Sequence, residues 1–139
     1  MFKDTAIAWL GAILLVMGAC SALTAQAADL GSYILTAPSV VDGDTINAEV
    51  PIWPGVYVTA SIRVAGVDTP EKNGSPCERP LAARATAFTV SWVNTHQPIT
   101  ISKLKPDKFS GRYDAVVTGR DGTLLAGALI ASGIGRPYS

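Results

Sequence analysis

The sequence has few residues from which disulfides or histidine-based metal sites are built. Its 139 residues include two cysteines and one histidine. Cys20 lies in an apolar N-terminal segment, so Cys77 is alone once that segment is removed, and no intramolecular disulfide is then possible. The single His96 argues against catalytic centres that need a histidine or a histidine metal cluster. A hydrophobic core must therefore hold the protein together, and the length suffices for one domain.

Charge is also scarce, and neither sign is in excess. Charged residues make up 16% of the chain, and 11 Lys and Arg balance 11 Asp and Glu to a formal net charge of zero. General nucleic-acid binders are usually basic, because phosphate contacts dominate their affinity. The overall charge gives no support to such a function, and any phosphate site must be local. Hydrophobic residues at 48% argue against disorder.

A long apolar run is present at the N-terminus, in residues 6–22. Ala-Gln-Ala at 25–27 fits the small-x-small pattern at which signal peptides are cleaved. We therefore predict a signal peptide in residues 1–27 and a secreted or periplasmic domain in 28–139, without stable membrane association. Two alternatives stay open. The run approaches the roughly 20 residues of a membrane anchor, and Cys20 is a candidate for lipidation.

Residues 32–66 show the alternation of β-strands. The pattern predicts strands over residues 32–41, 45–52 and 56–66, joined by short turns into a meander. A turn signature, Trp-Pro-Gly, separates the second strand from the third. We expect Trp53 in this turn to be partly buried. The predicted inward faces are Ile46, Ala48, Val50 and Ile52 in one strand and Val58, Ala60, Ile62 and Val64 in the next.

From about residue 78 the period becomes helical. Apolar residues recur at spacings of four, three and four, which indicates a helix ending near residue 94. Strands over residues 99–105 and 112–118 follow, and then a helix over 124–132 that Gly133 ends. Three strands, a helix, two strands and a helix form the pattern of a five-stranded OB-fold barrel. The pattern alone indicates a small α+β or barrel fold. The residues on the predicted face of the first helix are Leu81, Ala85, Phe88 and Trp92.

Three short clusters contain polar residues of the types that bind ligands or catalyse reactions. They are Asp-Gly-Asp-Thr at 42–45, Arg63 with Asp-Thr-Pro-Glu at 68–71, and Asp-Lys-Phe-Ser-Gly-Arg at 107–112. Each cluster alone is typical of turns and exposed loops. Their combination is more informative, because it holds acidic and guanidinium groups in one small domain.

Cleavage of a phosphodiester needs a cation near the phosphoryl oxygens, a base for water, and cationic groups that bind the phosphate. Asp44 and Asp68 are hard oxygen ligands that suit Ca²⁺. Glu71 follows Asp68 by three residues, close enough to reach water on the same cation. Arg63 and Arg112 offer planar, bidentate donors for phosphate.

The same clusters resemble the signatures of a known family. The segments 40–46 (Val-Val-Asp-Gly-Asp-Thr-Ile), 63–71 (Arg-Val-Ala-Gly-Val-Asp-Thr-Pro-Glu) and 107–112 resemble three signatures of the staphylococcal nuclease (thermonuclease) family, in order. Asp121-Gly122 with the helix after it resembles the family's last helix region. The resemblance implies an OB-fold and calcium-dependent hydrolysis of DNA or RNA that leaves 3′-phosphate ends.

The resemblance also implies which residues hold the metal. Asp44 and Asp68 would be the calcium carboxylates, and the backbone carbonyl of Thr69 would complete the protein ligands. Asp42 would lie close to the metal without binding it.

The resemblance assigns the reaction to three further side chains. Glu71 would activate or position the attacking water. Arg63 and Arg112 would bind the scissile phosphate and stabilise its transition state. Because all these groups are present, an active enzyme is expected, with a non-catalytic OB-type nucleic-acid-binding module as the alternative. We also expect the protein to be a monomer.

Some positions depart from the family pattern. Ser110 is an insertion before Gly111 and Arg112, which changes the length of the loop that carries Arg112. Phe109 stands where a tyrosine is associated with nucleotide binding. Weaker candidates for contacts to the substrate are Lys108, Tyr113 and Tyr138.

Overall fold

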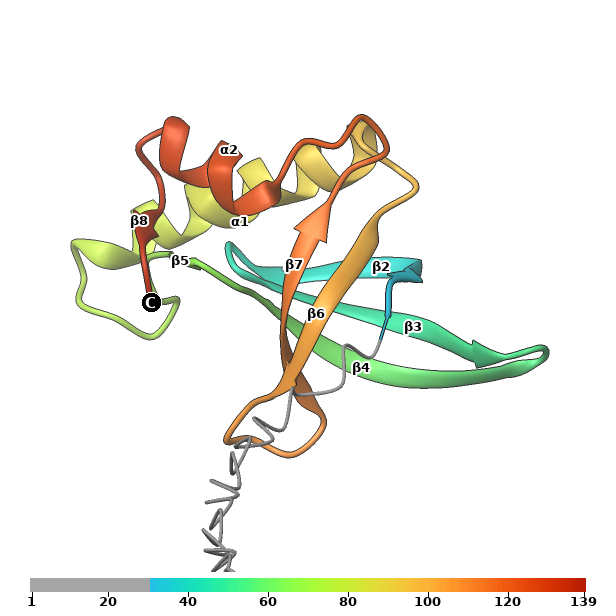
Figure 1. Ribbon diagram of the computed structural model, residues 1–139. Helices are drawn as coiled ribbons and strands as arrows, with labels where there is room; N and C mark the ends of the chain where they lie inside the picture. The colour runs from blue at the N-terminus through green and yellow to red at the C-terminus, as the bar shows by residue number, and fades with distance from the viewer. Residues whose placement is uncertain (1–30) are drawn as a thin grey trace, which may run out of the picture.

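The computed structural model describes residues 31–139, so the predicted signal segment, its cleavage after Ala27 and Cys20 lie outside the described residues. Within this range the chain forms a curled sheet, with two helices packed across one end (Figure 1). Neither helix has the length and apolar character needed to cross a membrane. The elements are β1 (Tyr33–Ile34), β2 (Thr36–Asp42), β3 (Thr45–Trp53), β4 (Val56–Val64), β5 (Val67–Asp68), α1 (Glu78–Thr95), β6 (Thr100–Pro106), β7 (Arg112–Thr118), α2 (Leu125–Ala131) and β8 (Arg136–Pro137).

Six strands form the main sheet, in the order β1-β6-β7-β4-β3-β2. The β4–β7 pair is parallel and the other pairs are antiparallel. The edge strands β1 and β2 are separated in the chain by Leu35 alone, so both edges meet there and the sheet curls into a half-barrel. The backbone N–H of Leu35 donates to the carbonyl of Ile99 at 2.9 Å. The predicted α+β class is confirmed.

The predicted count of five strands is wrong in two places. The first predicted strand divides at Leu35 into β1 and β2, which pair with different partners at the two edges of the sheet. A second, two-stranded sheet joins β5 to the C-terminal strand β8, through Val67 opposite Pro137 and Asp68 opposite Arg136. Two-residue strands of this kind leave no alternation for a sequence pattern to detect.

The core lies inside the curl of the sheet and under the helices. Along β3 and β4 the inward residues are buried as the alternation predicted, apart from Ile52 and Val58 near the hairpin end. Val58 is 41% exposed, so its predicted inward position is wrong, because this part of β4 lies beyond its pairing with β7. Buried residues of β6 and β7 and two leucines of α2 complete the core. Burying such side chains fully stabilises the fold by about 1.5–3 kcal/mol each. The fully buried members include Ile46, Ile62, Val64, Ile101, Ala115, Val117, Leu125 and Leu129.

The helix α1 presents a face rotated from the predicted one. Ala82, Ala85 and Thr89 are buried and pack on the β2 side of the sheet, whereas Leu81 is 47% exposed. The prediction for Leu81 was therefore wrong. Small residues on this face let the helix approach the sheet closely, and they carry little of the hydrophobic signal on which the prediction relied.

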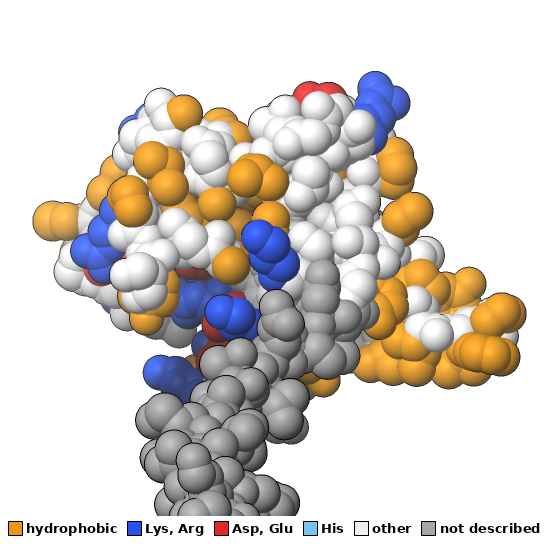
Figure 2. Space-filling view, viewed as in Figure 1, with side chains coloured by type: hydrophobic (Ala, Val, Ile, Leu, Met, Phe, Trp, Pro, Cys, Tyr) orange, Lys and Arg blue, Asp and Glu red, His pale blue; other side chains and the backbone are white. Residues whose placement is uncertain are grey.

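The far end of the β3–β4 hairpin extends beyond the core. Ile52 is 51% exposed and Trp53 is 74% exposed, so neither the inward position of Ile52 nor partial burial of Trp53 is found. Beyond Glu49, β3 pairs with β4 alone, and β7 joins β4 only from Ser61 onward. Hydrophobic side chains consequently gather on the surface of this hairpin (Figure 2).

Replacement of Leu129 by Ala should destabilise the fold strongly, because the side chain is fully buried between α2 and the sheet. Loss of a buried leucine with the cavity it leaves costs about 2–5 kcal/mol. Urea unfolding followed by circular dichroism measures the change. Leu124→Ala is the matched control, since Leu124 is 46% exposed and should cost far less. Equal losses for both variants would contradict the placement of α2.

Candidate functional site

The site begins at the tight turn between β2 and β3, against which α1 packs. A Cβ added at Gly43 would lie 2.7 Å from the Cβ of Ala85 and 2.7 Å from Oγ1 of Thr69. Only glycine fits such a close approach. The hydroxyl of Thr89 donates to the carbonyl of Gly43 at 2.6 Å, and both groups are buried. The helix thereby fixes the position of the carboxylates on either side of Gly43.

Asp44 is the buried acid of the site, with 6% of its surface exposed. Its Oδ2 accepts the backbone N–H of Thr69 at 3.2 Å, and its Oδ1 accepts the hydroxyl of Thr45 at 3.2 Å. Asp42 caps the turn by accepting the backbone N–H of Asp44 at 3.3 Å. Burial, and next the negative charge of Asp42, raise the pKa of Asp44, while the Thr69 N–H and Arg63 oppose the rise. Burial and the neighbouring Asp42 thus disfavour the ionised form of Asp44.

Arg63 brings the two predicted calcium carboxylates together. It lies on the outer face of β4, between the buried Ile62 and Val64. Its Nη2 is 3.3 Å from Oδ1 of Asp68 and 4.0 Å from Oδ2 of Asp44. Segments that are far apart in the sequence therefore converge on one guanidinium group.

Arg112 starts β7 and shares the outer face of the sheet with Arg63. It lies opposite Ser61 in the β4–β7 register, two positions from Arg63 along β4. Its Nε donates to Asp107, and its guanidinium carbon lies 4.4 Å from the centre of the Phe109 ring. The hydrogen bond from Arg112 is the main cause that lowers the pKa of Asp107. Arg112 thus pairs with Asp107, and its guanidinium makes no ion pair with the acids around Arg63 within residues 31–139.

Glu71 lies on the loop between β5 and α1, and its side chain is exposed. Its backbone N–H donates to Oε1 of Glu78 at 3.2 Å, and the N–H of Ser75 donates to Oε2 at 3.3 Å. Ser75 and Glu78 have the spacing of a capping box, so the sequence held a signal for this ordered loop. Within the described chain, the Glu71 carboxylate itself forms no hydrogen bond or ion pair.

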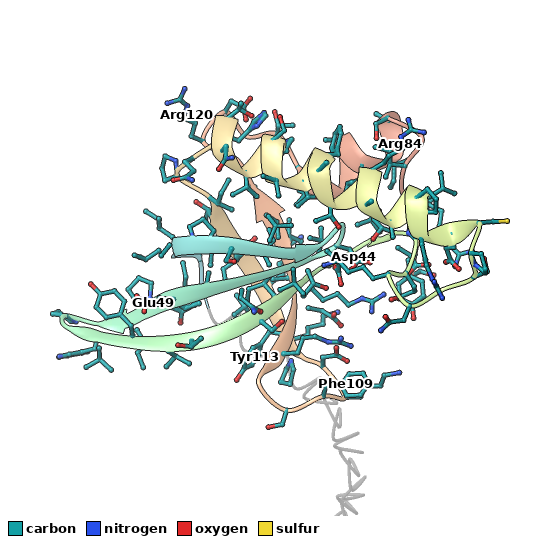
Figure 3. All side chains as sticks on the ribbon, turned by 180° about the vertical axis from the view of Figure 1, so that it is seen from behind. Asp44, Glu49, Arg84, Phe109, Tyr113 and Arg120 are labelled. Atoms are coloured by element: carbon teal, nitrogen blue, oxygen red, sulfur yellow. The ribbon has the colours of Figure 1, made fainter. Side chains whose placement is uncertain are left out.

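The three weaker candidates for contacts to the substrate lie in different parts of the structure. The ring of Tyr138 is 5.5 Å from the guanidinium carbon of Arg63, and both residues line a pocket of about 250 Å³. Lys108 is exposed, with its Nζ 5.2 Å from the Phe109 ring. Tyr113 lines an apolar groove with hairpin residues, on the opposite face of β7 from Arg112. Figure 3 shows Phe109 and Tyr113 toward the β6–β7 loop, away from Asp44.

One residue of the site was missed by the sequence reasoning. Arg136 of β8 reaches Asp68, with Nε 2.9 Å and Nη2 2.6 Å from Oδ2. This hydrogen bond raises the pKa of Arg136. The two residues are 68 positions apart, so no local spacing connects them. The short β5–β8 pairing is what brings them together.

The donors of the site fit a hard cation in their chemistry. Asp44 and Asp68 are carboxylates that share one guanidinium neighbour, and Ca²⁺ takes six to eight oxygen ligands, including backbone carbonyls and water. Burial of Asp44 beside Asp42 leaves negative charge that a cation would offset. In residues 31–139 no three His, Cys, Asp or Glu side chains form a ready metal cluster. Backbone oxygens and water would therefore have to complete the coordination.

The chain matches no protein-family model and no curated protein.

Thr89→Val should destabilise the protein, because it leaves the buried carbonyl of Gly43 without its donor at nearly unchanged side-chain volume. An unsatisfied buried group costs about 1–3 kcal/mol. Thr89→Ser keeps the hydroxyl and should restore most of this loss. Urea denaturation of the two variants measures the difference. Equal stability of Thr89→Val and the unmodified protein would show that this bond does not hold the turn.

Proposed function

We propose that the chain is a calcium-dependent nuclease of the staphylococcal nuclease type, which hydrolyses phosphodiester bonds of DNA or RNA and leaves 3′-phosphate ends. One observation carries the proposal: Arg63 lies against both Asp68 and Asp44, at 3.3 and 4.0 Å. The three residues come from two of the segments that resemble the family signatures. The second of these segments also contains Glu71, and the third cluster contributes Arg112.

The proposed fold is the OB-type barrel of that family, in which the curled sheet forms the barrel and α1 closes one end. The half-barrel curl and the helix between β5 and β6 support it. We also propose that the protein is exported by residues 1–27 and acts as a monomer. An uncleaved anchor or a lipid on Cys20 is the alternative for its location.

The carboxylates would hold the cation in the proposed site. Asp44 and Asp68 supply side-chain oxygens and Thr69 its backbone carbonyl, while Asp42 acts on Asp44 through the turn. The bound cation offsets charge on the phosphoryl oxygens and helps to ionise water. The buried N–H of Thr69 and the packed Gly43 turn hold Asp44 in place, so its side chain would move little when a cation binds.

The arginines would bind the reacting phosphate from the outer face of the sheet. Arg63 donates from β4 and Arg112 from β7, and planar guanidinium groups match two phosphate oxygens at once. Arg112 must first exchange its Asp107 partner for the phosphate. The exposed Glu71 carboxylate would accept a proton from the attacking water. The leaving oxygen would take up a proton from solvent.

A non-catalytic OB-type binding module is the alternative function. The exposed Trp53 hairpin favours it, because aromatic side chains on an OB surface can stack on bases. A binding module has no use for an acid that activates water, so Glu71 with both arginines supports the enzyme over the module.

Activity on single-stranded DNA should require Ca²⁺ and disappear in chelator, because the acidic site cannot hold a phosphate without a bridging cation. The protein is incubated with labelled DNA in Ca²⁺, in Mg²⁺ and in chelator, and the product ends are identified. Fragments with 3′-phosphate in Ca²⁺ alone are expected. Undiminished cleavage in chelator would contradict the metal site, and DNA binding without cleavage would favour the module.

Glu71→Gln should keep the fold and lower the turnover by about 10² to 10⁴, the usual contribution of a general base. The swap preserves size, and the carboxylate has no hydrogen-bond partner to lose. Glu49→Gln is the control, because Glu49 is an exposed acid on β3, well away from Asp44 (Figure 3). Turnover is compared at saturating Ca²⁺. If Glu71→Gln behaved as Glu49→Gln does, Glu71 would not be the base.

A further inference from the structure

Asp68, one of the two carboxylates proposed to hold the cation, already has cationic partners on both of its oxygens. Arg63 donates to Oδ1 at 3.3 Å. Arg136 donates to Oδ2 through two nitrogens, at 2.9 and 2.6 Å. An oxygen that accepts two charge-assisted hydrogen bonds has used both of its lone pairs. Oδ2 therefore has no lone pair left for a cation while Arg136 stays in place.

The two arginines differ in how easily they can leave. Arg63 is 21% exposed and is anchored on β4 inside the six-stranded sheet. Arg136 is 81% exposed and extends from a two-residue strand at the end of the chain. An exposed ion pair of this type contributes little, because water and salt compete with it. Arg136 is consequently the partner that can be displaced.

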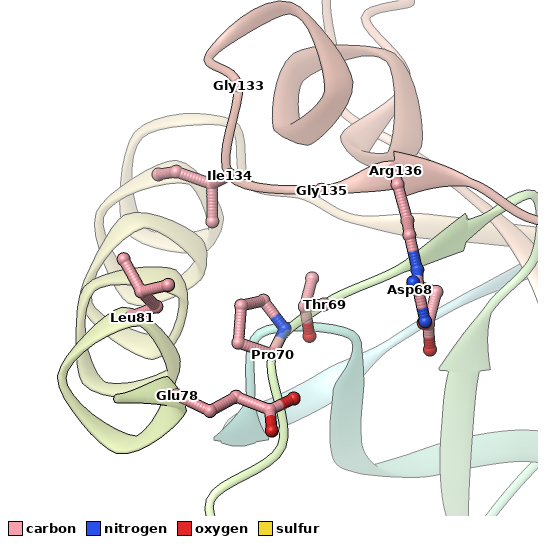
Figure 4. Close-up of a pocket in the computed structure, with 9 residues that line it drawn as sticks. All are labelled: Asp68, Thr69, Pro70, Glu78, Leu81, Gly133, Ile134, Gly135 and Arg136. Carbon is pink, nitrogen blue, oxygen red and sulfur yellow. The ribbon is translucent and has the colours of Figure 1, made fainter. Parts of the chain in front are cut away.

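Open space lies beside this pair. Asp68 and Arg136 line a pocket of about 280 Å³, together with Thr69, Pro70 and Glu78. Figure 4 shows the Arg136 side chain extended toward Asp68 at one side of the pocket, with Glu78 at another. Water and ions can reach Asp68 here, and the guanidinium group has room to swing out.

We infer that Arg136 is a built-in counter-ion of the metal-free site, which neutralises Asp68 and which a divalent cation must displace. The inference rests on the proposed function, since it takes Asp68 as a cation ligand. Two positive groups on one carboxylate repel each other, so cation binding and the Arg136–Asp68 pair oppose each other. Such coupling is reciprocal: what the pair adds to the stability of the metal-free protein, it subtracts from cation affinity.

The test is calorimetric titration of Ca²⁺ alone into the protein, without nucleic acid. Arg136→Gln should bind Ca²⁺ about two- to five-fold more tightly, the range that an exposed ion pair allows. Arg136→Lys keeps the charge but loses the two-nitrogen contact, so its affinity should lie between the two. Arg120→Gln is the matched control, an exposed arginine outside the site that should leave the affinity unchanged.

Thermal unfolding supplies a second readout. In chelator, Arg136→Gln should melt about 1–4 °C below the unmodified protein. At saturating Ca²⁺ the two should melt together, because Asp68 then has no arginine partner from β8 in either protein. Equal Ca²⁺ affinities, or weaker binding by Arg136→Gln, would overturn the counter-ion role and leave the nuclease proposal standing. Absence of Ca²⁺ binding by every variant would overturn both.

Discussion

The contact on which the site depends is the close packing of α1 against the turn at Gly43. The absence of a side chain at Gly43 lets Ala85 approach the backbone, and the Thr89 hydroxyl bonds the carbonyl of the same turn. This contact is buried and tightly packed, so it excludes water from one side of Asp44. The same packing that stabilises the fold thus creates the buried, acidic environment that raises the pKa of Asp44.

The charges around that turn come from three parts of the chain and form a linked series. Asp44 approaches Arg63, Arg63 binds Asp68, and Asp68 binds Arg136. Each carboxylate is therefore balanced by a guanidinium group that the proposed reaction would need to reposition. A buried charge left without a partner is costly. On the proposed function, Arg63 would serve two purposes, since it compensates the acids in the metal-free protein and would bind phosphate in the reaction.

Much of this arrangement could be predicted from the sequence, and the exceptions have physical causes. The alternation of hydrophobic and polar residues located β3 and β4, because inward positions such as Ile46 and Ile62 recur at every second residue. The strands β6 and β7 were also located from the sequence. The same reasoning placed Ile52 in the core, because the sequence pattern does not show where the β3–β4 hairpin extends beyond the neighbouring strands. The β5–β8 pairing was missed because each strand has two residues.

Local spacing predicts only part of the site, and the grouping of Asp44 with Asp68 came from the family resemblance. Arg63 and Asp68 are five positions apart across a tight turn, and their contact follows from that spacing. The contact of Asp68 with Arg136 depends on how the C-terminus returns to the sheet after Gly133, which no local pattern records. The pairing of Arg112 with Asp107 and the exposed position of Glu71 also depend on loop conformations, which sequence spacing does not determine.

On the proposed function, a chain without net charge would act on a polyanion, which places particular demands on the site. Binding driven by many phosphate contacts needs a basic surface, because each neutralised phosphate releases counter-ions. Here 11 basic residues are matched by 11 acidic ones, and several of the basic groups are paired with acids in the site. Attraction over a long stretch of nucleic acid is therefore weak. On the proposed function, the affinity must come from one or two phosphates held at Arg63 and Arg112, with the cation replacing Arg136 as the counter-charge of Asp68. Such a site would gain its positive charge only when the cation binds, so phosphate binding and cation binding would be coupled through the same carboxylate.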